Sequence, residues 1–157
     1  MQMKGDGLDR FDHAILEILG TEGRLSITDL AARVGLSKSP VQARLKRLEA
    51  EGVITGYRAT IDPVRLHREH VVFIQIKLTE TREAAIAAFN EAVRRIPEVE
   101  QCHLIAGHFD YLLKVRTADM VRYREVLAAR ISTLPHVAHT STYVAMQAVK
   151  DHAWVEA

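Results

Sequence analysis

The sequence predicts an α+β protein of two small domains, one helical and one built of strands and helices. Three observations support this fold class. Apolar residues recur at helical spacing up to about residue 50. From residue 71 onward, segments in which apolar residues recur at every second position are separated by segments with helical spacing. The length of 157 residues suits one domain or two small ones, and we expect them at residues 1–61 and 62–157.

The first expected helix has a capping signal at its start and glycines at its end. Asp9 is placed to cap it, and Asp12 three residues later provides an acidic variant of the capping box. Apolar residues then recur at helical spacing until Gly20 and Gly23. The helix is therefore expected to begin at Leu8-Asp9.

Two further helices follow. The second is expected to start at Ser26 and to stop at Gly35, where glycine most easily adopts a left-handed backbone. The third has Ser37 as its cap, Pro40 in the first turn and Gly52 beyond its end. Its apolar stripe consists of Val41, Leu45 and Leu48. Its opposite face carries Lys38, Ser39, Gln42, Ala43 and Lys46.

Two helices joined by a short glycine-containing turn, with a basic face on the second, predict a DNA-binding helix-turn-helix. An α-helix fits the major groove, where short or amide side chains reach base edges and cations neutralise phosphates. Gln42 is best placed to read a base, because its amide can pair with adenine at two positions. The alternative is a solvated basic face without a partner. The expected DNA contacts are Ser37, Lys38, Ser39, Gln42, Ala43, Lys46, Arg47 and Arg58.

The charge distribution agrees with this assignment. The whole chain carries 21 Lys and Arg against 20 Asp and Glu, a net charge of +1. Residues 33–58, however, contain six basic and two acidic side chains, whereas residues 1–32 contain three and six. The remaining residues carry 12 of each sign. The basic excess is therefore local to the third helix and its surroundings.

The segment after the third helix predicts a short wing or linker strand. Residues 53–61 are rich in β-branched side chains and are interrupted by Gly56. Arg58 lies in this segment, where it could contact the DNA backbone. Asp62-Pro63 ends it, because a residue before proline is held out of the helical conformation. The first domain is therefore a winged helix-turn-helix joined by a linker strand to the second.

The second domain has the order β-α-β-β-α-β. This order predicts a ferredoxin-like fold, a four-stranded antiparallel sheet with both helices on one face. A tight turn at Gly107-His108 joins the two middle strands. The expected elements are a strand at 71–78, a helix at 82–96, strands at 98–106 and 109–117, a helix at 118–134 and a strand at 136–149.

The strands of this sheet carry apolar residues on both faces. Leu112 alternates with Tyr111 and Leu113, and Val144 alternates with Tyr143. A sheet covered by helices on one side only should have one polar face. We therefore expect a second sheet to cover the other face, most simply from an identical subunit related by a two-fold axis. Such a dimer suits a helix-turn-helix that reads the half-sites of a palindromic operator.

Several spaced motifs occur in order along nearly the whole chain. They include Leu8-Asp9 with Asp12, Gly35-Leu36-Ser37-Lys38-Ser39-Pro40-Val41, Gly52-Val53-Ile54-Thr55-Gly56-Tyr57, Pro97-Glu98-Val99, Gly107 with Asp110-Tyr111, Leu134-Pro135 and Thr140-Ser141-Thr142. In these motifs the sequence resembles the Lrp/AsnC family of transcriptional regulators, also called feast/famine or leucine-responsive regulators. The match of many motifs in one order makes the resemblance specific.

The resemblance implies a sequence-specific DNA-binding regulator of amino-acid metabolism that responds to a small effector, usually an amino acid. It also implies a homodimer that assembles further into an octamer. In the family the effector lies between dimers, against the loop after the second strand and the last strand. The corresponding residues here are Leu104, Ala106, Gly107, His108, Phe109, Asp110, Thr140 and Thr142.

These residue types suit an amino-acid zwitterion. Asp110 could accept the ammonium group, while the backbone at Gly107 and the hydroxyl of Thr140 or Thr142 could bind the carboxylate. Glycine also lets a ligand approach the backbone closely. The alternative is that residues 107–110 form only a hairpin turn, with Asp110 bonded to its own backbone.

The sequence offers little support for an enzyme, a cofactor or a metal site. Cys102 and His103 are adjacent on a strand and point apart, and His136 and His139 are expected on opposite faces. A single cysteine, no signal peptide and no membrane-spanning stretch favour a cytoplasmic protein. The alternative function is a ligand-binding or small catalytic module whose N-terminal helices dock a protein. Binding to specific DNA with a steep salt dependence would favour the regulator.

Overall fold

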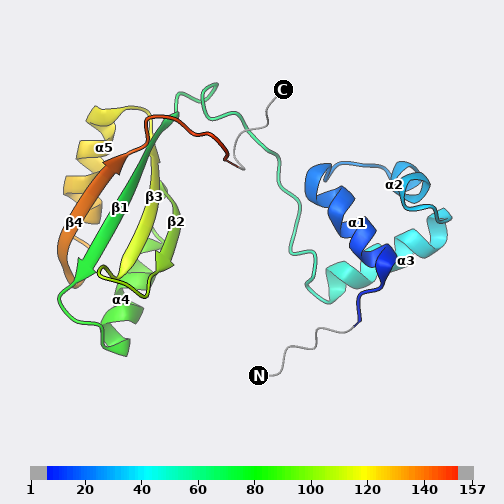
Figure 1. Cartoon of the computed structure of the whole chain (residues 1–157), viewed down its shortest axis with the longest axis horizontal. Coiled ribbons are helices and arrows are strands. Elements are labelled where there is room, and N and C mark those ends of the chain that lie inside the picture. Colours follow the sequence, from blue (N-terminus) through cyan, green and yellow to red (C-terminus); the bar gives the residue numbers. More distant parts are fainter. Residues whose placement is uncertain (1–6, 152–157) are drawn as a thin grey trace. The chain divides into compact units, whose positions relative to one another are not determined.

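The structure, a computed structural model, describes residues 7–151 and divides the chain into two compact units between Ala59 and Thr60 (Figure 1). The predicted boundary lies two residues further on. The outer ends of both predicted domains, residues 1–6 and 152–157, lie outside the described residues. Within residues 7–151, no helix is long and apolar enough to cross a membrane.

The N-terminal unit contains the three predicted helices, α1 (Arg10–Thr21), α2 (Ile27–Val34) and α3 (Lys38–Ala50). The capping box of α1 is complete: Asp12 N–H donates to Asp9 Oδ1 at 3.0 Å, and Asp9 N–H donates to Asp12 Oδ2 at 2.9 Å. Ser26 caps α2, and Gly35 ends it with a left-handed backbone at φ 77°. These local predictions are confirmed.

The core of this unit contains one or two residues from each helix. Its buried members are Ile15, Leu30, Ala31, Val41 and Leu48. Full burial of each large apolar side chain contributes roughly 1.5–3 kcal/mol. Because Val41 and Leu48 face the core, the opposite side of α3 is turned outward. The predicted apolar stripe of this helix is confirmed.

The linker strand that we expected at residues 53–61 is not formed in the described chain, where no strand lies between α3 and residue 70. Val53 and Ile54 instead donate their N–H groups to the Leu48 carbonyl at 2.9 and 3.0 Å. The Tyr57 hydroxyl donates to Glu49 Oε1 at 2.8 Å. The β-branched residues of this segment favour an extended backbone, but a strand also needs a neighbouring strand to pair with its backbone groups. This segment packs against the end of α3.

The second unit has the predicted ferredoxin-like topology, with all neighbouring strands antiparallel (Figure 1). The strand order is β2-β3-β1-β4. Its elements are β1 (His70–Leu78), α4 (Glu83–Val93), β2 (Val99–Leu104), β3 (Tyr111–Thr117), α5 (Met120–Val126) and β4 (Val137–Val144).

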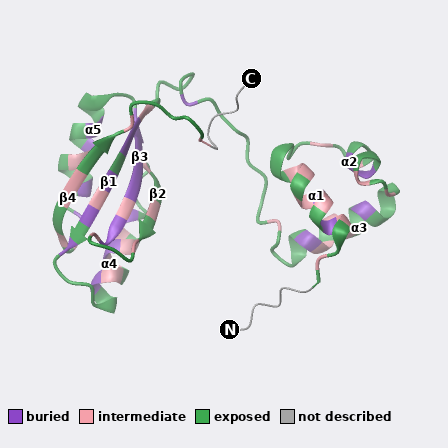
Figure 2. Ribbon diagram, viewed as in Figure 1, coloured by how far each residue is buried: buried purple, intermediate pink, exposed green. Residues whose placement is uncertain are grey.

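The core of this unit lies between one face of the sheet and the two helices. Val72, Ile74 and Ile76 of β1 are fully buried there, together with Phe89 of α4 and Tyr123 of α5. Figure 2 shows this burial concentrated in the central strands β1 and β3. We call the other face, which the helices leave uncovered, the open face.

The helix expected at residues 118–134 is α-helical only to Val126. It continues as a π-helical turn at Leu127–Ile131, where Ser132 N–H donates to the Leu127 carbonyl at 2.9 Å. Both Val126 and Ile131 are buried. Two residues five positions apart point in similar directions in the wider π turn but not in an α-helix. Burial of both side chains therefore favours the wider turn.

The last strand is shorter than the predicted 136–149. It ends at Val144, and Ala145 N–H makes the final bond to the Val71 carbonyl at 3.0 Å. Because β1 begins at His70, residues beyond this point have no neighbouring strand with which to pair. Met146 is consequently fully exposed.

Two glycine substitutions test the local account of the helix ends. Gly35→Ala should lower the free energy of unfolding of the N-terminal unit by about 1 kcal/mol, because residue 35 has a positive φ. Gly20→Ala should raise it by up to about 1 kcal/mol, because Gly20 lies in α1 with open space around its Cβ position. Amide hydrogen exchange in α1–α3 measures both effects. Equal tolerance of the two substitutions would contradict the account.

Candidate functional site

Most of the expected DNA-contact residues lie on one exposed surface of α3. We call this surface the α3 face; it consists of Lys38, Ser39, Gln42, Ala43 and Lys46, all exposed. Ser37, immediately before the helix, makes no side-chain capping bond, so its hydroxyl is not used by the helix. Among the described residues, none is hydrogen-bonded or ion-paired to the side chain of Lys38, Gln42 or Lys46. The face is thus available to a partner.

Arg47 behaves differently from its neighbours on α3. It is half-buried, and its Nη2 lies 2.6 Å from Asp12 Oδ2 in α1. We had expected this side chain to contact DNA, but its position between the helices makes it part of the packing of the unit. The sequence position of Arg47 beside Lys46 gave no indication of this, because its partner is 35 residues away.

Asp12 is the centre of a cluster that also contains Asp9, Arg44 and Arg47, here called the Asp12 cluster. Arg44 Nη1 lies 2.8 Å from Asp12 Oδ1 and 2.7 Å from Asp9 Oδ2. Burial raises the pKa of Asp12, but the Asp9 N–H and the two guanidinium groups outweigh this effect and lower its pKa to about 2. The carboxylate is therefore charged and links α1 to α3.

Ion pairs within the unit neutralise part of the local basic excess. Arg33 of α2 pairs with Glu22, and Arg44 and Arg47 pair with the Asp12 cluster. The acidic partners come from residues 1–32, the segment with the opposite charge excess. Of the six basic residues between 33 and 58, only three have no ion pair within the described chain: Lys38, Lys46 and Arg58.

The expected effector residues Ala106 to Phe109 lie in the hairpin between β2 and β3. Ile105 N–H donates to the Asp110 carbonyl at 2.9 Å and closes the hairpin. The backbone of Gly107 is not left-handed, and a Cβ there would meet Ile105 Cγ2 at 3.5 Å, an ordinary contact. The hairpin itself therefore does not require glycine, so the glycine keeps the surface open.

Asp110 is tied to the neighbouring strand β1. Its Oδ2 accepts the Leu78 N–H at 2.8 Å, and its Oδ1 accepts from Lys77 Nζ at 3.0 Å. Burial raises its pKa, but these two donors outweigh burial and lower the pKa overall. We had expected either a free ammonium acceptor or a bond to its own backbone. The structure instead shows a largely buried carboxylate that anchors the hairpin to β1.

The threonines of β4 approach the same place from the other side of β1. Thr140 is paired in register with Ile76, whose carbonyl also accepts the Asp110 N–H at 2.8 Å. Thr142 differs, because its hydroxyl lies 2.6 Å from the Tyr123 hydroxyl of α5. Leu104 is exposed at the end of β2. The structure thus gathers the hairpin and Thr140 around Ile76.

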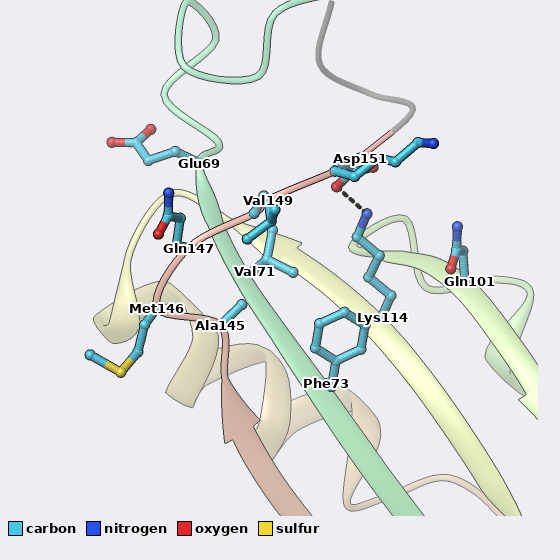
Figure 3. Close-up of a pocket in the computed structure, with 12 residues that line it drawn as sticks. Glu69, Val71, Phe73, Gln101, Lys114, Ala145, Met146, Gln147, Val149 and Asp151 are labelled. Atoms are coloured by element: carbon cyan, nitrogen blue, oxygen red, sulfur yellow. Dashed lines mark hydrogen bonds and ion pairs between the residues drawn. The ribbon is translucent and has the colours of Figure 1, made fainter. Parts of the chain in front are cut away.

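The open face contains a feature that the sequence did not predict. Lys114 and Arg116 of β3 are buried there and pair with Glu100 of β2 and with Asp151. Figure 3 shows Lys114 pointing toward Asp151 across a cavity of about 710 Å³. The cavity is lined by Glu69, Val71, Phe73, Gln101, Lys114 and residues 145–151. The sequence contains a signal for this feature, because Lys114 and Arg116 alternate with Leu113 and Val115 along β3.

Neither a metal site nor a reactive thiol is present among residues 7–151. No group of three His, Cys, Asp or Glu side chains is placed to hold a metal ion in this range. Cys102 packs against the core of the second unit, and burial raises the pKa of its thiol to about 11. At neutral pH the thiol is protonated and a poor nucleophile.

Family comparisons agree with both units. Residues 8–55 match a family model described as winged helix-turn-helix DNA-binding, and residues 71–155 match the Lrp/AsnC ligand binding domain. The chain belongs to the Lrp/AsnC family. It is therefore a DNA-binding transcriptional regulator with a separate ligand-binding domain.

Individual Lrp/AsnC relatives align over almost the whole chain. A proline dehydrogenase transcriptional activator from Rhizobium radiobacter is 57% identical over 94% of this chain and 95% of its own length. The leucine-responsive regulatory protein of Escherichia coli is 44% identical over 93% and 89%. A Neisseria meningitidis transcriptional regulator solved with L-methionine has a TM-score of 0.87 and 30% identity over 92% and 94%. These relatives are named as regulators, not enzymes.

The Asp12 cluster predicts a specific pH dependence. Asp12→Asn should lower the free energy of unfolding of the N-terminal unit by about 3 kcal/mol near pH 7, because two arginines lose a buried partner. The pKa of Asp12 in the folded state is about 2, below its ordinary 3.8. Its contribution is therefore complete above about pH 4 and disappears as the pH falls toward 2. Hydrogen exchange in α1 and α3 at several pH values measures both the loss of stability in Asp12→Asn and the pH dependence of the unaltered chain.

Glu22→Gln is the matched control, because it removes one carboxylate from an exposed pair with Arg33. It should change stability little at any pH. An Asp12→Asn variant that keeps the native stability and acid profile would contradict the assigned role of the cluster.

Proposed function

We propose that the chain reads its operator through the α3 face. The observation that supports this proposal is the contrast between the two sides of α3. One side is fixed by the core and by the Asp12 cluster, while the α3 face is exposed and has no partner among the described residues. Gln42 would read base edges in the major groove, and Lys38 and Lys46 would neutralise phosphates.

Further groups would position the helix on DNA. The α3 helix starts without a side-chain cap, so its N-terminal N–H groups and the Ser37 hydroxyl remain available for a phosphate. Ser39 and Ala43 are short enough for close approach to bases. Arg58 follows α3 and would contact the DNA backbone. Arg47, held by Asp12, is left out of this set.

We also propose that the second domain binds an amino acid at the hairpin around Gly107. The glycine leaves the backbone accessible, and His108 and Phe109 beside it would contact the effector side chain. Thr140 offers a hydroxyl for the carboxylate, with Leu104, Ala106 and Thr142 at the margins. Asp110 would order the hairpin and provide one edge of the site, rather than a free carboxylate. The methionine complex of the Neisseria regulator makes methionine a first candidate, and the leucine-responsive relative makes leucine another.

We further propose that two copies pack through their open faces, which would fill the cavity lined by Val71 and Phe73. Phe73 and Tyr143 are exposed apolar side chains on this face. Such a dimer would present two α3 helices to a palindromic operator. Assembly of dimers into octamers would follow the pattern of the family. Control of amino-acid metabolism accords with the relatives named for proline dehydrogenase activation and leucine response.

Two substitutions on the α3 face test the proposed interface with DNA. Gln42→Ala should reduce discrimination at one operator position, a difference of about 1–3 kcal/mol between the right and wrong base. Lys46→Ala should weaken binding to all sequences alike and reduce the slope of log affinity against log salt by about 0.9 per bound subunit. Competition binding with single-position operator variants separates the two effects. A uniform loss for both variants would remove Gln42 from its assigned role.

Thermal unfolding with added amino acids tests the effector site. L-Methionine or L-leucine at about 100 times its Kd should raise the Tm of the second domain by several degrees. Gly107→Ala should sharply reduce the rise but leave the unliganded Tm nearly unchanged, because the Cβ position meets only an ordinary contact. Gly20→Ala, in the other domain, should show the same rise as the unaltered chain. A full response in Gly107→Ala would show that the ligand binds elsewhere.

A further inference from the structure

The Asp12 cluster divides the four cations of α3 into two kinds. Arg44 and Arg47 both contact the carboxylate of Asp12, at 2.8 and 2.6 Å. Lys38 and Lys46 are exposed and have no ion pair within the described chain. Asp12 is the side chain that contacts both of the paired cations, whereas the two lysines remain exposed on the α3 face.

The held arginines cannot move to DNA without a penalty. The Asp12 side chain is fully buried, and it already accepts the Asp9 N–H of its own capping box. If Arg44 and Arg47 turned to phosphates, the carboxylate would remain buried without its cations, which is strongly unfavourable. Arg44 is further restrained by Asp9, 2.7 Å away, and by the Phe11 ring, 5.5 Å from its guanidinium carbon.

Withholding cations from DNA affects specific and non-specific binding differently. Each phosphate contact adds affinity for every sequence, because it acts through counterion release and not through base recognition. Two more mobile arginines on α3 would strengthen binding to random DNA, against which the operator has to compete. They would also loosen the attachment of α3 to α1, which sets the angle of Gln42. Both changes reduce the ratio of operator to random binding.

We propose that Asp12 is a specificity-determining positioning residue. It keeps Arg44 and Arg47 away from the DNA backbone, so that the regulator discriminates its operator from other DNA. The proposal rests on the proposed role of the α3 face. A purely structural Asp12 would affect binding to all DNA in parallel with the amount of folded protein, and it would leave the salt dependence unchanged.

The decisive variant is Arg47→Gln in the full-length chain, because it leaves Asp12 and Arg44 in place. Affinities are measured at several salt concentrations, on a random-sequence duplex and on an operator selected from a random pool. The slope of log affinity against log salt should be unchanged in Arg47→Gln. In Lys46→Ala it should fall by about 0.9 per bound subunit. An equal fall in both variants would overturn the proposal.

The Asp12→Asn variant provides the opposite test. Loss of the Asp12 charge frees Arg47 and leaves Arg44 held by Asp9 alone. The affinity for the random duplex should therefore rise several-fold, and the salt slope should steepen by about 1–2 per bound subunit. The ratio of operator to random binding should fall at least tenfold. The matched control is Glu91→Gln, which makes the same charge change in the second domain, where Glu91 pairs with Arg94 and Arg95. It should change none of these quantities.

A parallel loss of both affinities in folded Asp12→Asn, with an unchanged slope, would overturn the proposal. If Asp12→Asn does not fold, Arg47→Gln still decides. Lys46→Ala separates this proposal from the one on which it rests. If Lys46→Ala leaves the slope unchanged, the α3 face is not the DNA-binding surface; if its slope falls and that of Arg47→Gln falls equally, only the role of Asp12 fails.

Discussion

The attachment of α3 to α1 through Asp12 is the constraint on which the DNA-binding unit depends. One buried carboxylate accepts an N–H at the start of α1 and pairs with two arginines of α3. Apolar packing by Val41 and Leu48 turns the helix to the correct side, but apolar contacts are not directional. The hydrogen bond that Arg44 donates to Asp12 adds direction, because a guanidinium group has fixed donor geometry. Without these contacts the core would still decide which side of α3 is exposed, but the angle of the helix relative to α1 would not be fixed.

The same arrangement recurs in the second domain, where a carboxylate from one element orders another. Asp110 binds the backbone of β1 and thereby fixes the hairpin that carries Gly107. On the open face, Glu100 and Asp151 hold Lys114 and Arg116. In both domains several charged residues near the proposed sites are therefore held by contacts within the fold, and we propose that exposed lysines, hydroxyls, an amide and an open backbone make the contacts with DNA and effector.

Features that depend on residues close together in the sequence were predictable. The capping box of Asp9 and Asp12, the left-handed Gly35 and the alternating faces of β1 follow from spacing alone, and all are observed. The roles of Arg47 and Asp110 were not predictable, because each depends on a partner more than 30 residues away. The π turn, the early end of β4 and the unpaired linker likewise reflect packing and strand register. A residue type shows what a side chain can bind, whereas the fold decides which partner reaches it first.

The most direct test of the account is selection of DNA from a random duplex pool by the full-length protein at moderate salt. We predict an enriched sequence with two-fold symmetry, whose half-sites lie about one helical turn or a multiple of it apart. Hydrogen exchange of the complex should show protection concentrated at residues 37–46. Enrichment of no sequence, or protection confined to the second domain, would contradict the account.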